Sequence, residues 1–138
     1  MPGPRLIRYA AWCVCAGAAL ALLGAAEKPP SPSPRVVTLD PAAKEYVRVL
    51  GGVPETAGMR SGYVILQPSK TVGRHNTEGY EEAIIVLAGE GELRLAVGRA
   101  LGLKPGVVAY CPPGTEHDVA NTGRDPLRYV YVVARASR

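Results

Sequence analysis

The sequence GVVAYCPPGTEHDVAN, from Gly106 to Asn121, decides the fold of this chain. It opens with a short apolar run, Val107–Cys111, of the β-branched and aromatic type that fits a pleated, half-buried strand. Pro112-Pro113-Gly114 then predicts a tight turn, because these residues preset turn geometry. The turn leads into a second strand that presents His117, one of only two histidines in the chain.

The other histidine, His75, lies upstream in the stretch GRHNTEGYEE, residues 73–82. Residues two apart on a strand face the same way, so His75 and Thr77 are both expected to point inward. A strand-turn-strand passage then brings Glu82 back beside them. Two neutral imidazoles and a carboxylate that converge from separate strands suit a divalent ion such as Fe(II), Mn(II) or Zn(II). The sequence therefore predicts a metal site, provided that these side chains meet.

Short strands separated by Gly and Pro turns surround both stretches, and helical periodicity is almost absent. The expected strands are Arg35–Leu39, Met59–Gln67, Ala83–Leu87, Glu92–Val97, Ala100–Leu103, Val107–Cys111, His117–Ala120 and Leu127–Ala134. Ala83–Leu87 is continuously apolar and is therefore expected to be buried on both faces. Ala42–Leu50 fits either a helical turn or a strand. The pattern predicts an all-β sandwich or barrel.

The N-terminus predicts a secretory signal peptide over residues 1–26. Arg5 and Arg8 supply the positive charges, and an uncharged apolar run from Tyr9 to Ala26 ends in small residues suited to cleavage before Glu27. A retained membrane anchor is the alternative, because 18 residues reach the lower limit for a spanning helix. Residues 27–34 form a Pro/Ser-rich linker, and the folded domain is expected over residues 35–138. We expect a secreted or periplasmic protein with no membrane association after cleavage.

Charge and cysteine content narrow the possible partners and stabilising elements. Cleavage would remove two arginines and no acidic residue, so the formal net charge of +4 would fall to +2. The chain has no basic run or array of stacking aromatics, and we expect no nucleic-acid partner. Cys111 would be the single cysteine left, which excludes an internal disulfide. Stability must then come from a packed core, aided by a metal or by dimerisation.

The stretch that opens this section resembles the second motif of the cupin superfamily. That motif is a glycine, five residues, Pro-x-Gly, two residues, a histidine, three residues and an asparagine. Every position is matched, at Gly106, Pro112, Gly114, His117 and Asn121. The chain is therefore similar to small, secreted, single-domain cupins of the type-2 conserved barrel kind.

The first cupin motif is matched except at one position. It reads His-x-His, three or four residues, Glu, six residues and Gly, and the matches are His75, Glu82 and Gly89. Thr77 stands where the second histidine is expected, so the resemblance implies a three-ligand set of His75, Glu82 and His117. Glu82 is favoured over Glu81 and Glu78 by its spacing to Gly89. Those two carboxylates, or a water held by Thr77, are alternatives for completing the site.

The resemblance implies a single-domain β-barrel of jelly-roll type, with its motif core at residues 73–121 and its site inside the barrel. Such barrels often form homodimers. The cofactor would be one divalent transition metal, with Fe, Mn, Zn, Ni and Cu all open. A small-molecule substrate or ligand would be the partner.

Two functions follow, and the residues around the metal decide between them. One is a metal-dependent oxygenase- or isomerase-like enzyme that acts on a small oxygenated molecule. The other is a non-catalytic module that binds or senses a small ligand such as a sugar. An inward Arg, Tyr or Glu placed as acid or base would favour the enzyme, and an apolar, closed pocket would favour binding.

Several other residues have a structural interpretation. Cys111 is expected to be a buried small hydrophobe, although its place before the site loop leaves a thiolate role open. Asn121 is expected to hydrogen-bond in the turn before the last strand. The motif glycines are expected at turns, and the tyrosines are expected mainly in the core, where one facing inward would orient a ligand; these residues are Gly73, Gly89, Gly106, Gly114, Tyr63, Tyr110, Tyr129 and Tyr131.

Overall fold

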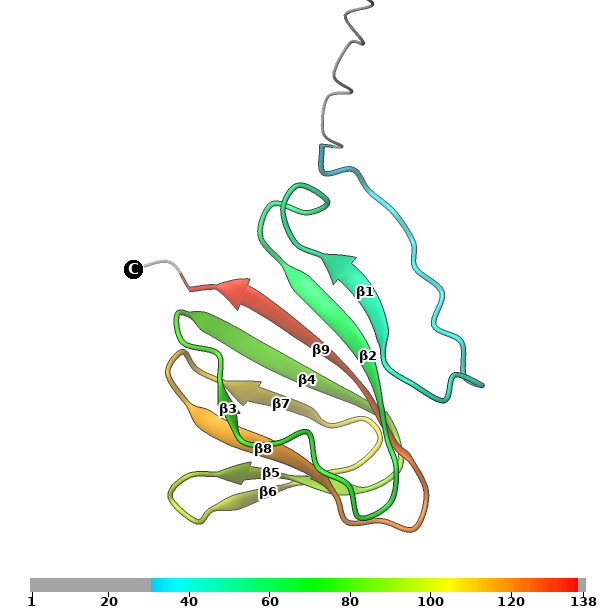
Figure 1. The fold of residues 1–138 in the computed structure, drawn as a ribbon, viewed down its shortest axis with the longest axis vertical. Coiled ribbons are helices and arrows are strands. Elements are labelled where there is room, and N and C mark those ends of the chain that lie inside the picture. The colour runs from blue at the N-terminus through cyan, green and yellow to red at the C-terminus, as the bar shows by residue number, and fades with distance from the viewer. Residues whose placement is uncertain (1–30, 137–138) are drawn as a thin grey trace, which may run out of the picture.

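The structure is a computed structural model that describes residues 31–136, and within that range the chain forms nine strands and no helix (Figure 1). All strand pairs are antiparallel. The strands are β1 (Val47–Gly51), β2 (Arg60–Leu66), β3 (His75–Asn76), β4 (Tyr80–Ala88), β5 (Gly91–Leu95), β6 (Ala100–Leu103), β7 (Val108–Cys111), β8 (Glu116–Asn121) and β9 (Leu127–Arg135).

The strands form two sheets that face each other, as Figure 1 shows. The larger sheet has the order β1-β2-β9-β4-β7, and the smaller has the order β3-β8-β5-β6. The chain passes from one sheet to the other between β2 and β3, β3 and β4, β4 and β5, β6 and β7, β7 and β8, and β8 and β9. This repeated crossing confirms the all-β, jelly-roll type of barrel expected from the sequence.

The core fills the space between the two sheets. Its buried residues are Leu66, Ile84, Val86, Leu93, Leu103, Ala109, Cys111, Val119, Leu127 and Tyr129. They come from seven strands and alternate with more exposed neighbours, as expected where one face of a sheet is buried.

Gly89 allows the chain to leave β4 for the opposite sheet. Its φ of 80° lies in the left-handed region, and a Cβ there would lie 2.5 Å from the carbonyl oxygen of Pro126. A side chain would therefore meet both conformational strain and a fixed backbone atom. The other motif glycines, Gly73, Gly106 and Gly114, also have positive φ, in keeping with their expected place at turns.

Two strand expectations need correction, and one open alternative is decided. Arg35–Leu39 is not a strand, because it has no pairing partner, and Val36 is 93% exposed. The ambiguous segment Ala42–Leu50 contains no helix and supplies β1 from Val47 onward. Ala83–Leu87 is buried on one face only, with Ile84 and Val86 inside and Leu87 exposed. The continuous apolar run of β4 therefore does not indicate burial on both faces, because the outer face of this strand is partly open to solvent.

The predicted signal peptide, residues 1–26, and most of the linker lie outside the described residues. Cleavage and export therefore stay predictions. Within residues 31–136, no helix is long and apolar enough to cross a membrane.

Candidate metal centre

Three side chains from three strands meet inside the barrel. His75 on β3, Glu82 on β4 and His117 on β8 each offer one ligand atom, and these atoms all lie within 4.8 Å of one another. Ligands at about 2.0–2.2 Å from one ion lie roughly 3–4 Å apart, so small side-chain movements would fit this group to a metal. The structure thus brings together the residues that the sequence singled out.

The two histidines are direct partners on paired strands. His75 on β3 lies opposite His117 on β8, so both side chains point to the same face, and their ring centroids are 4.4 Å apart. His75 Nδ1 donates to the carbonyl of Gly73 at 2.8 Å, and His117 Nδ1 donates to the carbonyl of Thr115 at 2.9 Å. Each carbonyl belongs to the residue two positions upstream. Both rings therefore turn Nε2 toward the centre, as metal-ligating imidazoles commonly do.

Because β3 has only two residues, contacts around it must fix its position on β8. The amide of Gly73 donates to the carboxylate of Asp118 at 2.9 Å, and Arg74 pairs with Glu116 at 3.1 Å. The side-chain amide of Asn76 donates to the carbonyl of Gly114 at 3.0 Å. These bonds hold the strand in register, and with it the approach of one histidine to the other.

The alternation of β4 decides between the neighbouring carboxylates. Glu82 is 6% exposed and faces the histidines, whereas Glu81 lies on the outer face and accepts a hydrogen bond from Tyr110. Glu78 sits at the turn with a φ of 53°, outside the ligand group. Thr77 lines the cavity, but its hydroxyl donates to the carbonyl of Tyr80 at 2.7 Å. Of the carboxylates considered from the sequence, Glu82 is the one brought to the histidines.

Glu82 and His117 form a buried pair. Glu82 Oε2 lies 3.1 Å from His117 Nε2, and the His117 side chain is fully buried. The Cys111 side chain and then the Glu82 carboxylate beside its ring raise the pKa of His117 to about 10, against the opposing effect of burial. A metal would take the place of the proton on Nε2, because a ligating imidazole must be neutral.

Cys111 is buried and free, as expected for a small hydrophobe. It lies directly opposite Glu82 across the β4–β7 pair, so the two side chains leave the sheet on the same face. Its sulfur is not part of the group of ligand atoms within 4.8 Å of one another. Its contact with His117 places it beside the site, as a neighbour of a possible ligand.

A cavity of about 730 Å³ opens beside the three candidate ligands. It lies over the inner face of the larger sheet, and the segment around β3 closes one side. Valines form much of its wall, together with polar groups. The lining residues are Tyr46, Arg60, Val64, Val72, Gly73, Arg74, His75, Thr77, Glu82, Val119, Tyr129, Tyr131 and Val133.

Two tyrosine hydroxyls meet in the cavity wall. Tyr46 and Tyr131 stack with centroids 6.5 Å apart, and their hydroxyl oxygens are 3.0 Å from each other. Burial, and then the hydrogen bond with Tyr46, raise the pKa of Tyr131 to about 12. Burial also raises the pKa of Tyr129. The hydroxyls of Tyr129 and Tyr131 therefore stay protonated near neutral pH and can act as donors.

The structure corrects and extends the expectations for the tyrosines and Asn121. Tyr63 and Tyr129 are buried, but Tyr110 is 57% exposed and bonds Glu81 on the outer face. Asn121 hydrogen-bonds Asp125 and Gly123 in the turn before β9, as expected.

Arg60 and Tyr46 were not singled out from the sequence. They enter the cavity through the pairing of β2 with β9 and the stacking of Tyr46 on Tyr131, which join segments far apart in the chain.

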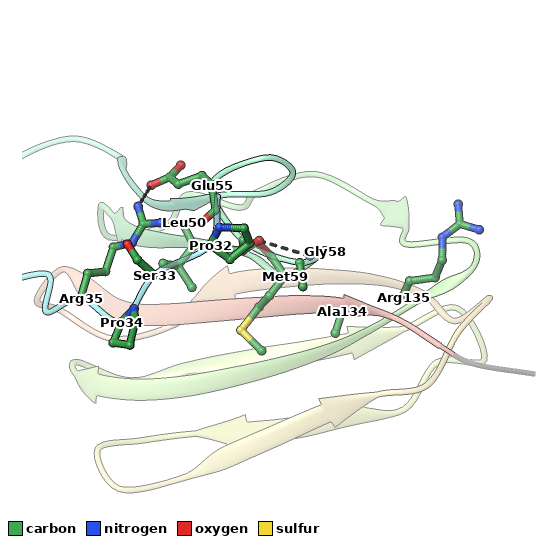
Figure 2. A pocket seen from close by; sticks show the side chains of 12 residues that line it. Pro32, Ser33, Pro34, Arg35, Leu50, Glu55, Gly58, Met59, Ala134 and Arg135 are labelled. Carbon is green, nitrogen blue, oxygen red and sulfur yellow. Dashed lines mark hydrogen bonds and ion pairs between the residues drawn. The ribbon is translucent and has the colours of Figure 1, made fainter. Parts of the chain in front are cut away.

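A second cavity of about 730 Å³ lies away from this group (Figure 2). It is formed where the segment Pro32–Arg35 passes the loop after β1, and Arg35 pairs there with Glu55 at 2.6 Å. Among the described residues that line it there is no histidine, and Glu55, its single carboxylate, is already paired. The first cavity, where the candidate ligands converge, is therefore the candidate functional site.

Comparisons with known proteins agree with this geometry. An oxalate-binding protein of Thermotoga maritima is 34% identical over 68 residues, which are 49% of this chain and 55% of that protein. The chain thus matches about half the length of this curated relative. A solved double-stranded β-helix protein from Klebsiella pneumoniae is 26% identical with a TM-score of 0.61, and the match covers 75% of this chain and 91% of that one.

A cupin 2 conserved barrel domain protein from Salinispora arenicola shares the fold at 23% identity. Its TM-score is 0.62, with 75% of this chain and 91% of that one covered. The family described as the cupin domain matches residues 62–133, more than half of the chain. That range runs from β2 to β9 and includes all three candidate ligands. This chain belongs to the cupin domain family.

Proposed function

We propose that this protein binds one divalent transition metal through His75, Glu82 and His117 and uses it to hold a small carboxylate ligand. The observation that carries the proposal is the shared orientation of the two imidazoles. Each Nδ1 is committed to a backbone carbonyl, and each Nε2 is turned toward the Glu82 carboxylate. Two nitrogens and one oxygen suit Fe, Mn, Zn, Ni or Cu.

The ligand class follows from the cavity beside that group. Arg60 lines it and adds positive charge near the metal position, which favours an anion. The hydroxyls of Tyr46 and Tyr131 are donors, and a carboxylate accepts both N–H and O–H groups. A relative with 34% identity over part of its length is named an oxalate-binding protein, which supports a carboxylate as the ligand.

The described lining offers proton donors for an enzyme or for simple binding, and it offers no carboxylate base apart from a candidate metal ligand. Among the described residues that line the cavity, Glu82 is the single carboxylate, and it is itself a candidate ligand. Burial raises the pKa of Tyr129 and Tyr131, so these two inward tyrosines are suited to donate rather than accept a proton. A bound metal would supply the Lewis-acidic charge that holds a carboxylate oxygen.

An oxygenase- or isomerase-like enzyme is the second candidate. A set of two histidines and one carboxylate leaves coordination positions open, which is the arrangement that suits such chemistry. Turnover of a bound ligand, measured on metal-loaded protein under air and under nitrogen, separates this candidate from simple binding.

The metal centre is tested by titrating each metal into chelator-treated protein in a calorimeter. We compare the parent protein with Glu82→Gln, which keeps the side-chain shape and removes the charge. Glu81→Gln is the matched control, because it makes the same change one position along β4 on the outer face. His75→Ala and His117→Ala complete the series.

We expect one metal per chain in the parent protein and in Glu81→Gln, and at least about tenfold weaker binding in the other three. Oxalate should then bind the metal-loaded protein and not the metal-free one. Equal metal binding in Glu82→Gln and Glu81→Gln would sink the proposed site. Equal oxalate affinity in the metal-loaded and the metal-free protein would contradict the proposed role of the metal.

A further inference from the structure

The guanidinium of Arg60 lies on the same side of the larger sheet as the candidate metal ligand Glu82. Arg60 on β2 is opposite Val133 on β9, and Val133 is opposite Glu82 on β4. Residues directly opposite one another in antiparallel strands face the same way. The backbones of Arg60 and Glu82 are therefore about 9–10 Å apart, the width of two strand spacings, with the cavity above them.

Tyr80 holds Arg60 in place without occupying its hydrogen-bonding edge. The guanidinium carbon of Arg60 lies 4.7 Å from the centroid of the Tyr80 ring. Tyr80 precedes Glu82 by two positions, so both side chains leave β4 on the same face. A cation stacked on a ring uses its flat face, and the N–H groups at the edge stay available for a carboxylate.

Arg60 shares the Tyr80 ring with Arg135 and has no anionic partner in the described part of the chain. Among residues 31–136, no carboxylate lies within ion-pairing distance of its guanidinium. Arg74, the other arginine that lines the cavity, is paired with Glu116 at 3.1 Å. Among the described residues that line the cavity, Arg60 is thus the arginine available to bind an anion.

Hydroxyl donors line the same cavity as Arg60, His75 and Glu82. Tyr131 lies two residues before Val133 on β9, so its side chain is on the same face of the sheet as those of Arg60 and Glu82. Its hydroxyl oxygen is 3.0 Å from that of Tyr46. Both the Glu82 carboxylate and the Arg60 guanidinium act on the pKa of Tyr131, with opposite signs and after the larger effects of burial and Tyr46. The Tyr131 hydroxyl is a donor on the cavity side of the larger sheet, where Arg60 and Glu82 also lie.

We propose that the ligand is an aliphatic dicarboxylate whose first carboxylate binds the metal and whose second binds Arg60 with the Tyr131 hydroxyl. This inference rests on the proposed function. Val133 lies between Arg60 and Glu82 in their row, and other valines line the cavity, which suits a hydrocarbon spacer. The volume of about 730 Å³ exceeds what a two-carbon ligand fills. The spacer makes the ligand longer than oxalate.

The test compares dicarboxylates with monocarboxylates of the same length on metal-loaded protein. Oxalate, malonate, succinate and glutarate are titrated beside butyrate and pentanoate, which match the last two in carbon number. We expect succinate or glutarate to bind at least about tenfold more tightly than its monocarboxylate partner, because a charge-assisted contact is added. Oxalate should bind more weakly than the best of the series.

Arg60→Gln should abolish the dicarboxylate advantage, measured as the ratio of dicarboxylate to monocarboxylate affinity, and should leave one metal bound per chain. Arg135→Gln is the matched control, because Arg135 also stacks on Tyr80, at 5.5 Å, but does not line the cavity. Tyr131→Phe, which keeps the ring, should reduce the advantage in part. Thermal melting of each variant verifies that it is folded, and Arg60→Met, which also removes the charge and keeps an aliphatic stem, serves as the substitute if Arg60→Gln does not fold.

The outcomes separate the two proposals. Normal metal and monocarboxylate binding with no dicarboxylate advantage, or an advantage that survives in Arg60→Gln, would overturn this inference alone. Loss of the advantage in Arg135→Gln as well would also overturn it, because the effect would then come from the Tyr80 stack. No metal binding in the parent protein would instead overturn the proposed function.

Discussion

Replacing Asn121 by alanine tests whether this motif residue is structural, as its contacts indicate. Asn121 is 3% exposed and makes three side-chain hydrogen bonds. Its Nδ2 donates to the carbonyls of Leu66 and Asp125, both at 2.8 Å, and its Oδ1 accepts from the amide of Gly123 at 2.9 Å. These bonds join the end of β2 to the turn between β8 and β9.

The size of the effect follows from those three bonds. Each contributes about 0.5–1.5 kcal/mol net, and a buried carbonyl left without a partner costs about 1–3 kcal/mol. The loss should therefore be about 3–4 kcal/mol for Asn121→Ala. Since 1 kcal/mol corresponds to about 4–8 °C for a domain of this size class, the melting temperature should fall by at least about 12 °C.

The assay is urea unfolding followed by circular dichroism, with melting as a second measure. Asn76→Ala is the matched control, because exposed Asn76 makes two similar hydrogen bonds, to Gly114 and Glu78. Water can replace those bonds, so we expect a loss below about 1 kcal/mol there. Folded Asn121→Ala should keep parent metal affinity. Equal destabilisation by the two variants, or metal loss from folded Asn121→Ala, would refute the reasoning.

Two further predictions concern protonation and the crossing between sheets. Because the Cys111 side chain and Glu82 raise the pKa of His117 to about 10, metal must displace a proton, and affinity should rise about tenfold per pH unit near neutrality. Calorimetry in buffers of different ionisation enthalpy counts that proton, and a pH-independent affinity would contradict its release. In metal-free protein, the raised pKa of His117 means that its protonation stabilises the fold, and this contribution is complete below pH 6.5. The contribution is lost as the pH rises through about 10. The melting temperature should therefore fall between pH 6.5 and about pH 10. Gly89→Ala should cost more than about 2 kcal/mol in urea unfolding, because its Cβ would meet a backbone oxygen at 2.5 Å. Gly98→Ala is the control with similar φ and open space, and an equal loss there would show that φ alone is responsible.

Local pattern was enough to predict most strands and the motif turn, because both depend on neighbours in the chain. The Pro112–Gly114 turn and the histidine after it lie within one hairpin-sized stretch. Glu82 could be favoured over Glu81 because alternation along a strand and the spacing to Gly89 are short-range features. These residues carry both the fold and the candidate ligands.

The sequence-based predictions failed where the structure depends on pairing between strands that are far apart in the chain. Arg35–Leu39 has strand-like composition but meets no free sheet edge, and strand propensity alone does not bury Val36. Arg60 could not be placed beside Glu82, because their relation passes through Val133, more than fifty residues away from Glu82. Cross-strand rows of this kind need the sheet order, which the sequence of one chain does not display.

The hydrogen bonds from each histidine to a carbonyl two residues upstream make the two halves of the centre separable in principle. Gly73-x-His75 and Thr115-x-His117 each set their own tautomer within three residues. Their meeting depends instead on the short pairing of β3 with β8. Each histidine is thus oriented by a hydrogen bond within its own tripeptide, whereas the distance between the two histidines depends on the folded barrel. Either tripeptide grafted onto another antiparallel strand should carry its ring orientation with it, and a partly unfolded barrel should lose metal while both imidazoles remain correctly turned.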